Sequence, residues 1–202
     1  MKKIRPRTKP PEVRREELMN AAQRIFLRQG IAGTSVDEIV AAAGVAKGTF
    51  YLHFDSKEAL LQALQGRFVA DLDGALRAAL AGGRPGDWRA RLRAWIRAAV
   101  DGYRNQAALH HLVFHAFRPE APPRRHENPA ITALAAFLAA GTRAGAWSVE
   151  TPRLTASMMF HALHGLLDET GGGPKRTDRP QLVHALGSFF DRALRPVSAR
   201  RP

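Results

Sequence analysis

Four polar side chains crowd into one short stretch of the sequence, GVAKGTFYLHF at residues 44–54. They are Lys47, Thr49, Tyr51 and His53. A lysine ammonium donates to guanine in the major groove of DNA, a threonine offers a hydroxyl and a methyl group, and phenol and imidazole groups suit phosphates. Gly48 lets the backbone approach DNA closely. These residue types favour contact with DNA, and the alternative is an ordinary solvated helix face.

The two phenylalanines of the same stretch indicate which way its polar side chains point. Phe50 and Phe54 are four residues apart, so on a helix they share one face with Val45. We expect that face to pack on the preceding helices and the polar side chains to point outward. A turn of a few residues, Gly44–Ala46, separates the stretch from the helix before it, which predicts a short third helix set at an angle. This is the pattern of a helix-turn-helix.

Three further helices must position this stretch, and the sequence carries signals for each of them. Residues 14–29 repeat apolar side chains at helical spacing. Ser35 and Glu38 form a capping box that begins a second helix, and each of these first two helices ends at a glycine. Residues 55–58 are another capping signal, and a long apolar helical pattern runs over residues 60–80. No segment alternates as a strand would, so we predict an all-α protein.

The residues that carry these signals follow one another almost without a gap between residues 12 and 61. They are Ala22, Phe26, Gly30, Thr34–Val36, Ile39, Ala43–Tyr51, His53, Phe54, Ser56–Glu58 and Leu60. The run resembles the DNA-binding domain of the TetR family of bacterial transcriptional regulators. Two positions depart from the commonest family pattern. Val40 replaces an alanine, and Ala46 stands where a serine often caps the third helix, so we expect that helix to fray at its start.

The resemblance implies roles for individual residues. The third helix would enter the major groove, where the threonine, tyrosine and histidine of the motif contact double-stranded DNA. Residues at the start of the second helix, Thr34 and Ser35, and at the start of the fourth, Lys57, would touch the phosphate backbone. The predicted DNA contacts, including two from the residue types alone, are Thr34, Ser35, Lys47, Gly48, Thr49, Tyr51, His53 and Lys57.

The rest of the chain is less distinctive but also helical. Helical patterns cover residues 87–103, 107–117, 129–144, 151–168 and 180–195. This half resembles the family's ligand-binding and dimerisation domain in layout only. We therefore expect four parts, which are a basic disordered arm at 1–10, a helix-turn-helix DNA-binding domain at 11–57, a helical ligand-binding and dimerisation domain at 58–195, and a disordered tail at 196–202. The arm would add phosphate or minor-groove contacts.

The helix expected at 151–168 carries two apolar stripes, which is more than one core needs. Its surplus face and the last helix predict an isologous two-fold interface between two copies of the chain. The predicted interface residues are Met158, Ala162, Gly165, Leu166, Leu182, Leu186, Phe189 and Phe190. Such a homodimer would place two reading helices in successive major grooves of a near-palindromic site. The alternative is that both helices are buried in the core of a monomer.

Aromatic and histidine side chains gather in the middle of the chain, and apolar sites for small molecules are often lined by such residues. Most of them are expected to be ordinary core. The resemblance implies an effector pocket here, near which we place Trp95, Tyr103, Phe114 and His115. His111 and His115 are also spaced to chelate a metal, but no neighbouring Glu-x-x completes a zinc motif. We expect no metal, no cofactor and no catalytic residue.

Composition sets outer limits on function. The formal net charge of +13 suits a polyanionic partner, although the excess is spread along the chain. Cysteine is absent, which excludes disulfides and thiolate metal sites and fits a cytoplasmic location. The longest uncharged runs are about 14 residues, fewer than the roughly 20 that span a bilayer. The basic start lacks the apolar stretch of a signal peptide.

The interpretation that unites these observations is a dimeric, ligand-responsive DNA-binding regulator, a repressor released from its operator by a small-molecule effector. The helix over residues 60–80 would be the lever, and Gly66 and Gly74 would let it bend. One alternative is a DNA-binding regulator without an effector, whose C-terminal half only dimerises. A metal-dependent hydrolase built on the histidines is disfavoured, because no carboxylate or nucleophile joins them in a recognisable spacing.

Overall fold

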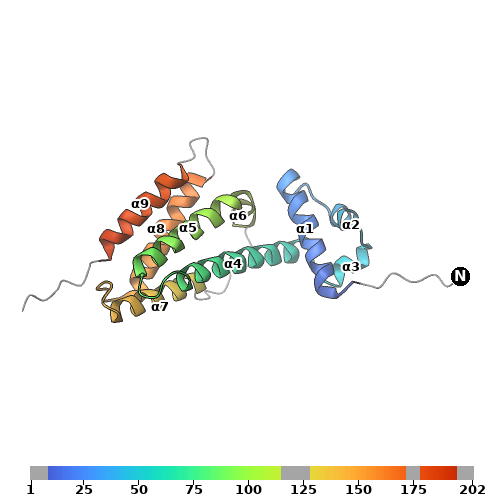
Figure 1. Cartoon of the computed structure of the whole chain (residues 1–202). Coiled ribbons are helices and arrows are strands. Elements are labelled where there is room, and N and C mark those ends of the chain that lie inside the picture. The colour runs from blue at the N-terminus through green and yellow to red at the C-terminus, as the bar shows by residue number, and fades with distance from the viewer. Residues whose placement is uncertain (1–8, 115–127, 172–177, 195–202) are drawn as a thin grey trace, which may run out of the picture. The chain divides into compact units, whose positions relative to one another are not determined.

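The chain is built from helices in the part that the structure describes. This computed structural model describes residues 9–114, 128–171 and 178–194 and has no strand in those ranges (Figure 1). The helices are α1 (Pro11–Gln29), α2 (Val36–Ala43), α3 (Lys47–Tyr51), α4 (Lys57–Ala81), α5 (Trp88–Asn105), α6 (Ala107–Phe114), α7 (Pro129–Arg143), α8 (Pro152–Gly171) and α9 (Arg179–Ala193). The all-α prediction is confirmed. Within the described ranges, every helix is too short or too polar to span a bilayer.

The helices form two compact units. The first comprises the described residues of Met1–Phe68 and Ala108–Arg118, and the second those of Val69–Ala107 and Pro119–Pro202. The division falls inside α4, later than the boundary after residue 57 expected from the sequence. It falls there because the apolar side chains of the first half of α4, from Leu60 to Phe68, are buried in the first unit. The predicted arm and tail lie almost wholly outside the described residues.

Side-chain and glycine caps set the ends of the first helices. The Ser35 hydroxyl accepts from the Glu38 amide at 3.2 Å, and the Ser35 amide donates to the Glu38 carboxylate at 2.8 Å. That second bond holds the pKa of Glu38 below its usual value. Gly44 then ends α2 in the left-handed conformation, with φ at 66°. The predicted capping box is confirmed, and Ala46 starts α3 without a side-chain cap, as expected.

The first helix begins three residues earlier than its apolar pattern predicted, at Pro11. Proline is well suited to the first turn of a helix, because its φ angle is already helical and its missing N–H has no partner there anyway. The buried face of this helix is the predicted one, with Leu18, Ala21, Ala22, Ile25 and Phe26 all buried. Helix α1 packs on α2, and α2 packs on α3.

A lysine from the start of α4 fastens the loop between α1 and α2. The Lys57 ammonium donates to the carbonyl oxygens of Ile31 and Thr34, at 2.8 Å each. Thr34 is buried, and its hydroxyl donates to the Gly30 carbonyl at 2.7 Å. These bonds satisfy carbonyl groups at the end of α1 that have no partner within the helix. The loop before α2 is therefore held from two sides.

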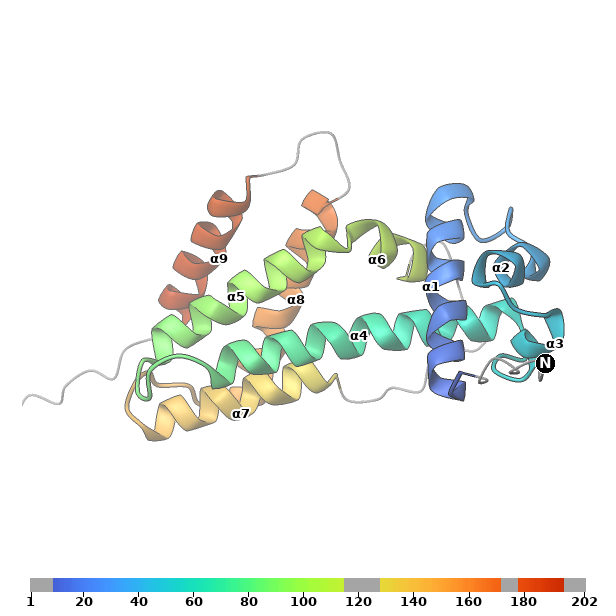
Figure 2. The same cartoon turned by 45° about the vertical axis from the view of Figure 1, so that its right-hand side comes forward.

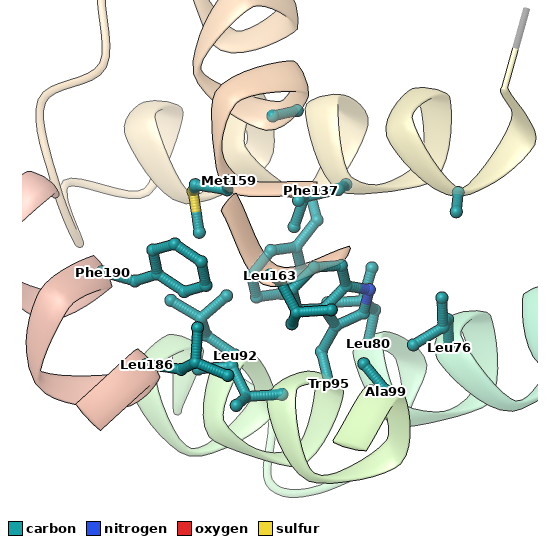
Figure 3. Close-up of a cluster of buried hydrophobic side chains, with 14 of the residues drawn as sticks. Leu76, Leu80, Leu92, Trp95, Ala99, Phe137, Met159, Leu163, Leu186 and Phe190 are labelled. Carbon is teal, nitrogen blue, oxygen red and sulfur yellow. The ribbon is translucent and has the colours of Figure 1, made fainter. Parts of the chain in front are cut away.

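The second unit has one continuous apolar core. Its largest fully buried side chains are Trp95 of α5, Trp147 of the loop after α7, and Phe190 of α9. Figure 3 shows Met159 and Leu163 of α8 facing Leu186 and Phe190 of α9 across this core.

The helices of the second unit pack in pairs. Helix α7 packs on α8, and α5 packs on both α9 and α8. In Figures 1 and 2 the ribbon of α5 lies beside that of α9. Gly141 of α7 leaves room for the ring of Trp147 in the loop that follows. A Cβ atom at Gly141 would lie 2.2 Å from that ring.

We expect Lys57→Met to lower the free energy of unfolding by about 1–3 kcal/mol, because two loop carbonyls lose a charged donor while the side chain keeps its length. Lys47→Met is the matched control. Its ammonium is exposed and pairs with Asp37, so the same change should leave the free energy of unfolding nearly unchanged. Urea unfolding followed by circular dichroism measures both, and a Lys57→Met protein as stable as the control would contradict this role.

Candidate nucleic-acid interface and ligand cavity

Helix α3 presents one buried face and one open face. Phe50 is 0% exposed and Phe54 is 4% exposed, whereas Tyr51 between them is 52% exposed. Lys47 and Gly48 are exposed, and Thr49 and His53 are half-buried. The prediction that the two phenylalanines turn inward and the polar side chains outward is therefore confirmed for this helix, with the threonine and histidine nearer its edge.

Leu52 is a surface residue that sequence reasoning missed. It follows α3 directly and is 82% exposed, more than any other large hydrophobic side chain among the described residues. An apolar side chain in that position is able to contact a thymine methyl group. The sequence did contain a signal for this exposure. Leu52 stands between Tyr51 and His53, which were expected to point outward, and it does not fall on the face of Phe50.

The ammonium of Lys47 has a partner in the free protein. It lies 2.9 Å from the Asp37 carboxylate of α2, and this hydrogen bond raises the pKa of Lys47 above its usual value. Both side chains are more than half exposed, at 54% and 69%. An exposed pair of this kind contributes little to stability, so a phosphate or a base edge can replace Asp37 at small cost.

Two of the predicted DNA contacts have internal roles for their side chains. The buried Thr34 hydroxyl bonds to Gly30, and the Lys57 ammonium bonds to two loop carbonyls. Ser35 is exposed, but its hydroxyl caps α2. The contacts of these three residues with the DNA backbone stay predictions. The structure gives Thr34 and Lys57 structural roles that the sequence did not suggest, and it confirms the capping role predicted for Ser35.

Arg67 of α4 makes hydrogen bonds to α1 that sequence reasoning also missed. One nitrogen of its guanidinium donates to Glu16 at 2.6 Å and to Asn20 at 2.9 Å, and another donates to Gln23 at 2.7 Å. All three acceptors lie on one side of α1, at helical spacing. The group therefore ties α4 to α1 within the first unit. No local pattern signals it, because the partners are 44 to 51 residues away in the sequence.

The structure brings together two of the four predicted ligand residues. Trp95 and Tyr103 line a small hollow of about 20 Å³ in the second unit, with walls from α4, α5 and α8. The Tyr103 hydroxyl donates to Asp168 at 2.6 Å. Burial first, and this carboxylate second, raise the pKa of Tyr103 above its usual value, so the phenol stays neutral.

A third predicted ligand residue, Phe114, does not line that hollow. Phe114 lies in the first unit, where its ring contacts Phe68 and His110, and it is 36% exposed. His115 lies outside the described residues. Among the residues that the structure covers, no three His, Asp or Glu side chains gather closely enough to hold a metal ion.

A larger and more open hollow, of about 250 Å³, lies elsewhere in the second unit, at the end of α4. Two arginines line it, and one of them, Arg91, lies over the rings of Trp88 and Phe137 at 4.9 and 5.1 Å from their centroids. The same guanidinium donates to the Leu80 carbonyl at 2.7 Å. Through these contacts Arg91 holds the last turn of α4 and satisfies one of its carbonyl groups.

The predicted dimer interface divides into two groups. Met158 is 57% exposed and Phe189 is 53% exposed, and Ala162 and Gly165 are exposed as well. Leu166 is half-buried. The remaining three, Leu182, Leu186 and Phe190, are at most 4% exposed and belong to the core of their own chain. Their assignment to an interface was wrong, because the inward face of α9 packs on α5.

Comparison with known proteins agrees with this architecture. Residues 18–64 match the family described as bacterial regulatory proteins, tetR family, and residues 87–188 match the tetracyclin repressor-like C-terminal domain. The repressor KstR2 of Rhodococcus jostii is 36% identical over 100 residues, which are 48% of each chain. The activator FasR of Mycolicibacterium smegmatis is 36% identical over 105 residues, 52% of this chain and 47% of FasR. The chain thus spans about half the length of these relatives.

Solved structures extend the likeness over the whole fold. A putative transcriptional regulator from Pseudomonas aeruginosa PAO1 superposes with a TM-score of 0.75 at 28% identity, covering 92% of both chains. The fatty acid degradation regulator FadR from Bacillus halodurans superposes with a TM-score of 0.72 at 21% identity, covering 94% of this chain and all of FadR. At 21% identity, the likeness to FadR concerns the fold alone. With its helix-turn-helix matched in one model and half of its length in the other, the chain belongs to the TetR family of DNA-binding transcriptional regulators.

Proposed function

We propose that this regulator is a ligand-responsive homodimeric repressor that binds a near-palindromic DNA site through helix α3 of each protomer. One observation carries the proposal. Helix α3 buries Phe50 completely and leaves the neighbouring Tyr51 more than half exposed, so its polar side chains are free to meet a groove. A DNA partner also fits the net charge of +13 and a cytoplasmic location.

We expect each side chain on the open face of α3 to make a different kind of contact with DNA. Tyr51 is held edge-on against Phe50, with ring centroids 5.3 Å apart, so its hydroxyl is presented by a ring that the core already fixes. Lys47 would exchange Asp37 for a phosphate or a guanine. Leu52 would add an apolar contact beside them. Thr49 and His53, at the edge of the face, would complete the reading surface.

The exposed apolar side chains of α8 and α9 support a homodimer. Leu154, Met158 and Phe189 are each more than half exposed in the single chain. Several large apolar side chains left in water on neighbouring helices mark a surface for association. A two-fold axis through such a surface uses the same patch twice and sets two α3 helices about 34–36 Å apart on one face of DNA.

Helix α4 supports ligand response. It carries Arg67, which is bonded to α1, and also Leu72 and Leu76, which line the small hollow beside Trp95. A ligand that prefers one position of α4 would change the population of DNA-competent dimers by its difference in affinity for the two forms. The small volume of the hollow favours the second candidate, a regulator without an effector, unless side chains move to enlarge it.

The DNA contact of α3 is tested by Tyr51→Ala, which should weaken binding to a selected duplex by about 1–3 kcal/mol, because one phosphate or base contact is lost. Leu27→Ala is the control, since Leu27 is similarly exposed, at 44%, but lies on α1. Fluorescence anisotropy with duplexes selected from a random library gives both affinities. Equal weakening in the two variants, or none in Tyr51→Ala, would argue against α3 as the reading helix.

We expect Asp37→Asn to strengthen DNA binding two- to fivefold, about 0.5–1 kcal/mol, because it removes the carboxylate that competes with DNA for Lys47. The same substitution in a Lys47→Met background should give a smaller gain, since only the general repulsion of phosphate is then relieved. The anisotropy assay measures the difference between the two backgrounds. An identical gain in both would show that Lys47 is not the residue released.

The interface is tested by Met158→Asp combined with Phe189→Asp. Two carboxylates in an apolar interface cost several kcal/mol, so sedimentation should show a monomer with native helix content and much weaker DNA binding. Val69→Asp is the control, because Val69 is also exposed, at 40%, but lies on α4. A double variant that stays dimeric would remove this surface from the proposal.

A further inference from the structure

The two most deeply buried tryptophans of the second unit differ in one respect. Trp95 and Trp147 are both 0% exposed. The indole N–H of Trp147 donates to the Leu138 carbonyl at 2.8 Å. The indole nitrogen of Trp95 has no hydrogen-bond partner among the described residues. A buried donor without an acceptor costs stability, and native proteins rarely keep one without a function.

The residue that carries the unpartnered nitrogen, Trp95, belongs to the wall of the small hollow. Trp95, Leu76 and Ala99 line it together, and Figure 3 shows the indole nitrogen on the side of the ring where Leu80 and, beyond it, Leu76 lie. Six of the nine lining residues are leucine, alanine or phenylalanine. A buried water normally needs two to four polar partners. A wall that is mostly hydrocarbon therefore suits an apolar molecule with one acceptor better than a water.

The lining also decides the charge of such a molecule. No lysine or arginine is among the nine lining residues, and the one imidazole, His164, stacks on Phe160, so an anion would be buried without a permanent counter-charge. A simple cation has no acceptor to offer an indole N–H, which only donates. The Tyr103 hydroxyl already gives its proton to Asp168. What remains is a neutral molecule with one acceptor oxygen.

The rings around the hollow favour a flat molecule. His164 stacks on Phe160, with centroids 5.9 Å apart at 23°, and meets the edge of Tyr103 at 6.3 Å. Aromatic faces arranged in this way pack well against a planar ring. Leu72, Phe160 and His164 are half-buried, whereas Trp95 is fully buried, so these three form the outer wall.

The outer wall explains how a hollow of about 20 Å³ admits a ligand. A guest larger than a water must displace at least one of these half-buried side chains. Leu72 packs closely on α5, because a Cβ atom at Gly102 would lie 2.8 Å from its Cδ1 atom. A guest that displaces Leu72 therefore acts on α4 against α5. By this route, ligand entry and a change in α4 are the same event.

We propose that the effector is a neutral, planar, mainly apolar molecule whose single carbonyl or ether oxygen accepts from Trp95 Nε1. The inference rests on the proposed function for its regulatory meaning, because a guest at this site acts through α4. The chemical class itself depends only on the lining of the hollow and can be tested without DNA.

Acetophenone is a suitable probe, since it joins one carbonyl to one flat ring. Its matched controls are α-methylstyrene, in which a methylene replaces the oxygen, and benzoate, which keeps the ring but carries a charge. Titration of ¹⁵N-labelled full-length protein follows the indole N–H signals of the three tryptophans. We expect acetophenone to shift the Trp95 signal saturably, α-methylstyrene to bind at least about fivefold more weakly, and benzoate not to saturate.

Two substitutions complete the test. Trp95→Phe keeps a ring in the core and removes the donor, so the preference for acetophenone over α-methylstyrene should fall to about one. Trp147→Phe makes the same change at the satisfied tryptophan, so it should keep the preference and lower thermal stability more than Trp95→Phe does. Equal binding of the two neutral probes by the wild type, saturable benzoate binding, or an unmoved Trp95 signal would overturn the proposed class.

DNA binding is measured separately so that the two proposals fail in different ways. Acetophenone that shifts Trp95 and weakens DNA binding supports both. A shift of Trp95 with unchanged DNA affinity supports the ligand class and overturns ligand response in the proposed function. Trp95→Phe should bind DNA like the wild type in the absence of probe, because the residue does not belong to the DNA-binding unit.

Discussion

The burial of Phe50 and Phe54 orients the surface by which we expect this protein to meet DNA. Their rings lie 5.8 Å apart, and the Arg15 guanidinium of α1 lies 5.1 Å from the Phe54 centroid. A helix of five residues has too few internal hydrogen bonds to be stable alone. Tertiary packing must therefore supply its stability, and the same packing decides that Tyr51 faces water.

Helix α4 gains its importance from polar contacts to distant parts of the chain. At its start the Lys57 ammonium holds the loop before α2, and ten residues later Arg67 is bonded to three side chains of α1. Charge-assisted hydrogen bonds are stronger than neutral ones, and those of Lys57 and the bond from Arg67 to Gln23 are also partly buried. They make the first half of α4 part of the DNA-binding unit. The second half contributes Leu76 and Leu80 to the other core. One continuous helix thus contributes residues to both units, and this continuity is what the proposed ligand response depends on.

In the second unit, apolar side chains on one face of a helix are buried in the core, and those on another face of the same helix are exposed. On α8, Met159, Leu163 and Leu167 are buried in the core, while Leu154 and Met158 remain exposed. On α9, Phe190 is inside and the adjacent Phe189 is outside. The outer side chains remain exposed in a single chain, and this exposure is the observation behind the proposed homodimer. The inner ones close the core so tightly that the hollow beside Trp95 is water-sized.

The sequence alone determined the local order of this protein. The capping box at Ser35 and Glu38, the glycine after each of the first two helices, and the four-residue spacing of Phe50 and Phe54 depend on neighbours in the chain, so pattern reasoning could find them. The resemblance of residues 12–61 to a known family followed from the same stretch. Tertiary structure decided whatever joins distant residues. Whether Leu186 and Phe190 face their own core or a partner depends on where α5 lies, and periodicity shows only that a face is apolar. The partners of Lys57 and Arg67 are brought to them only when separate helices meet, and the same packing leaves the Trp95 indole without an acceptor among the described residues. Hydrogen bonds between distant residues leave no period in the sequence, so pattern reasoning could not predict them.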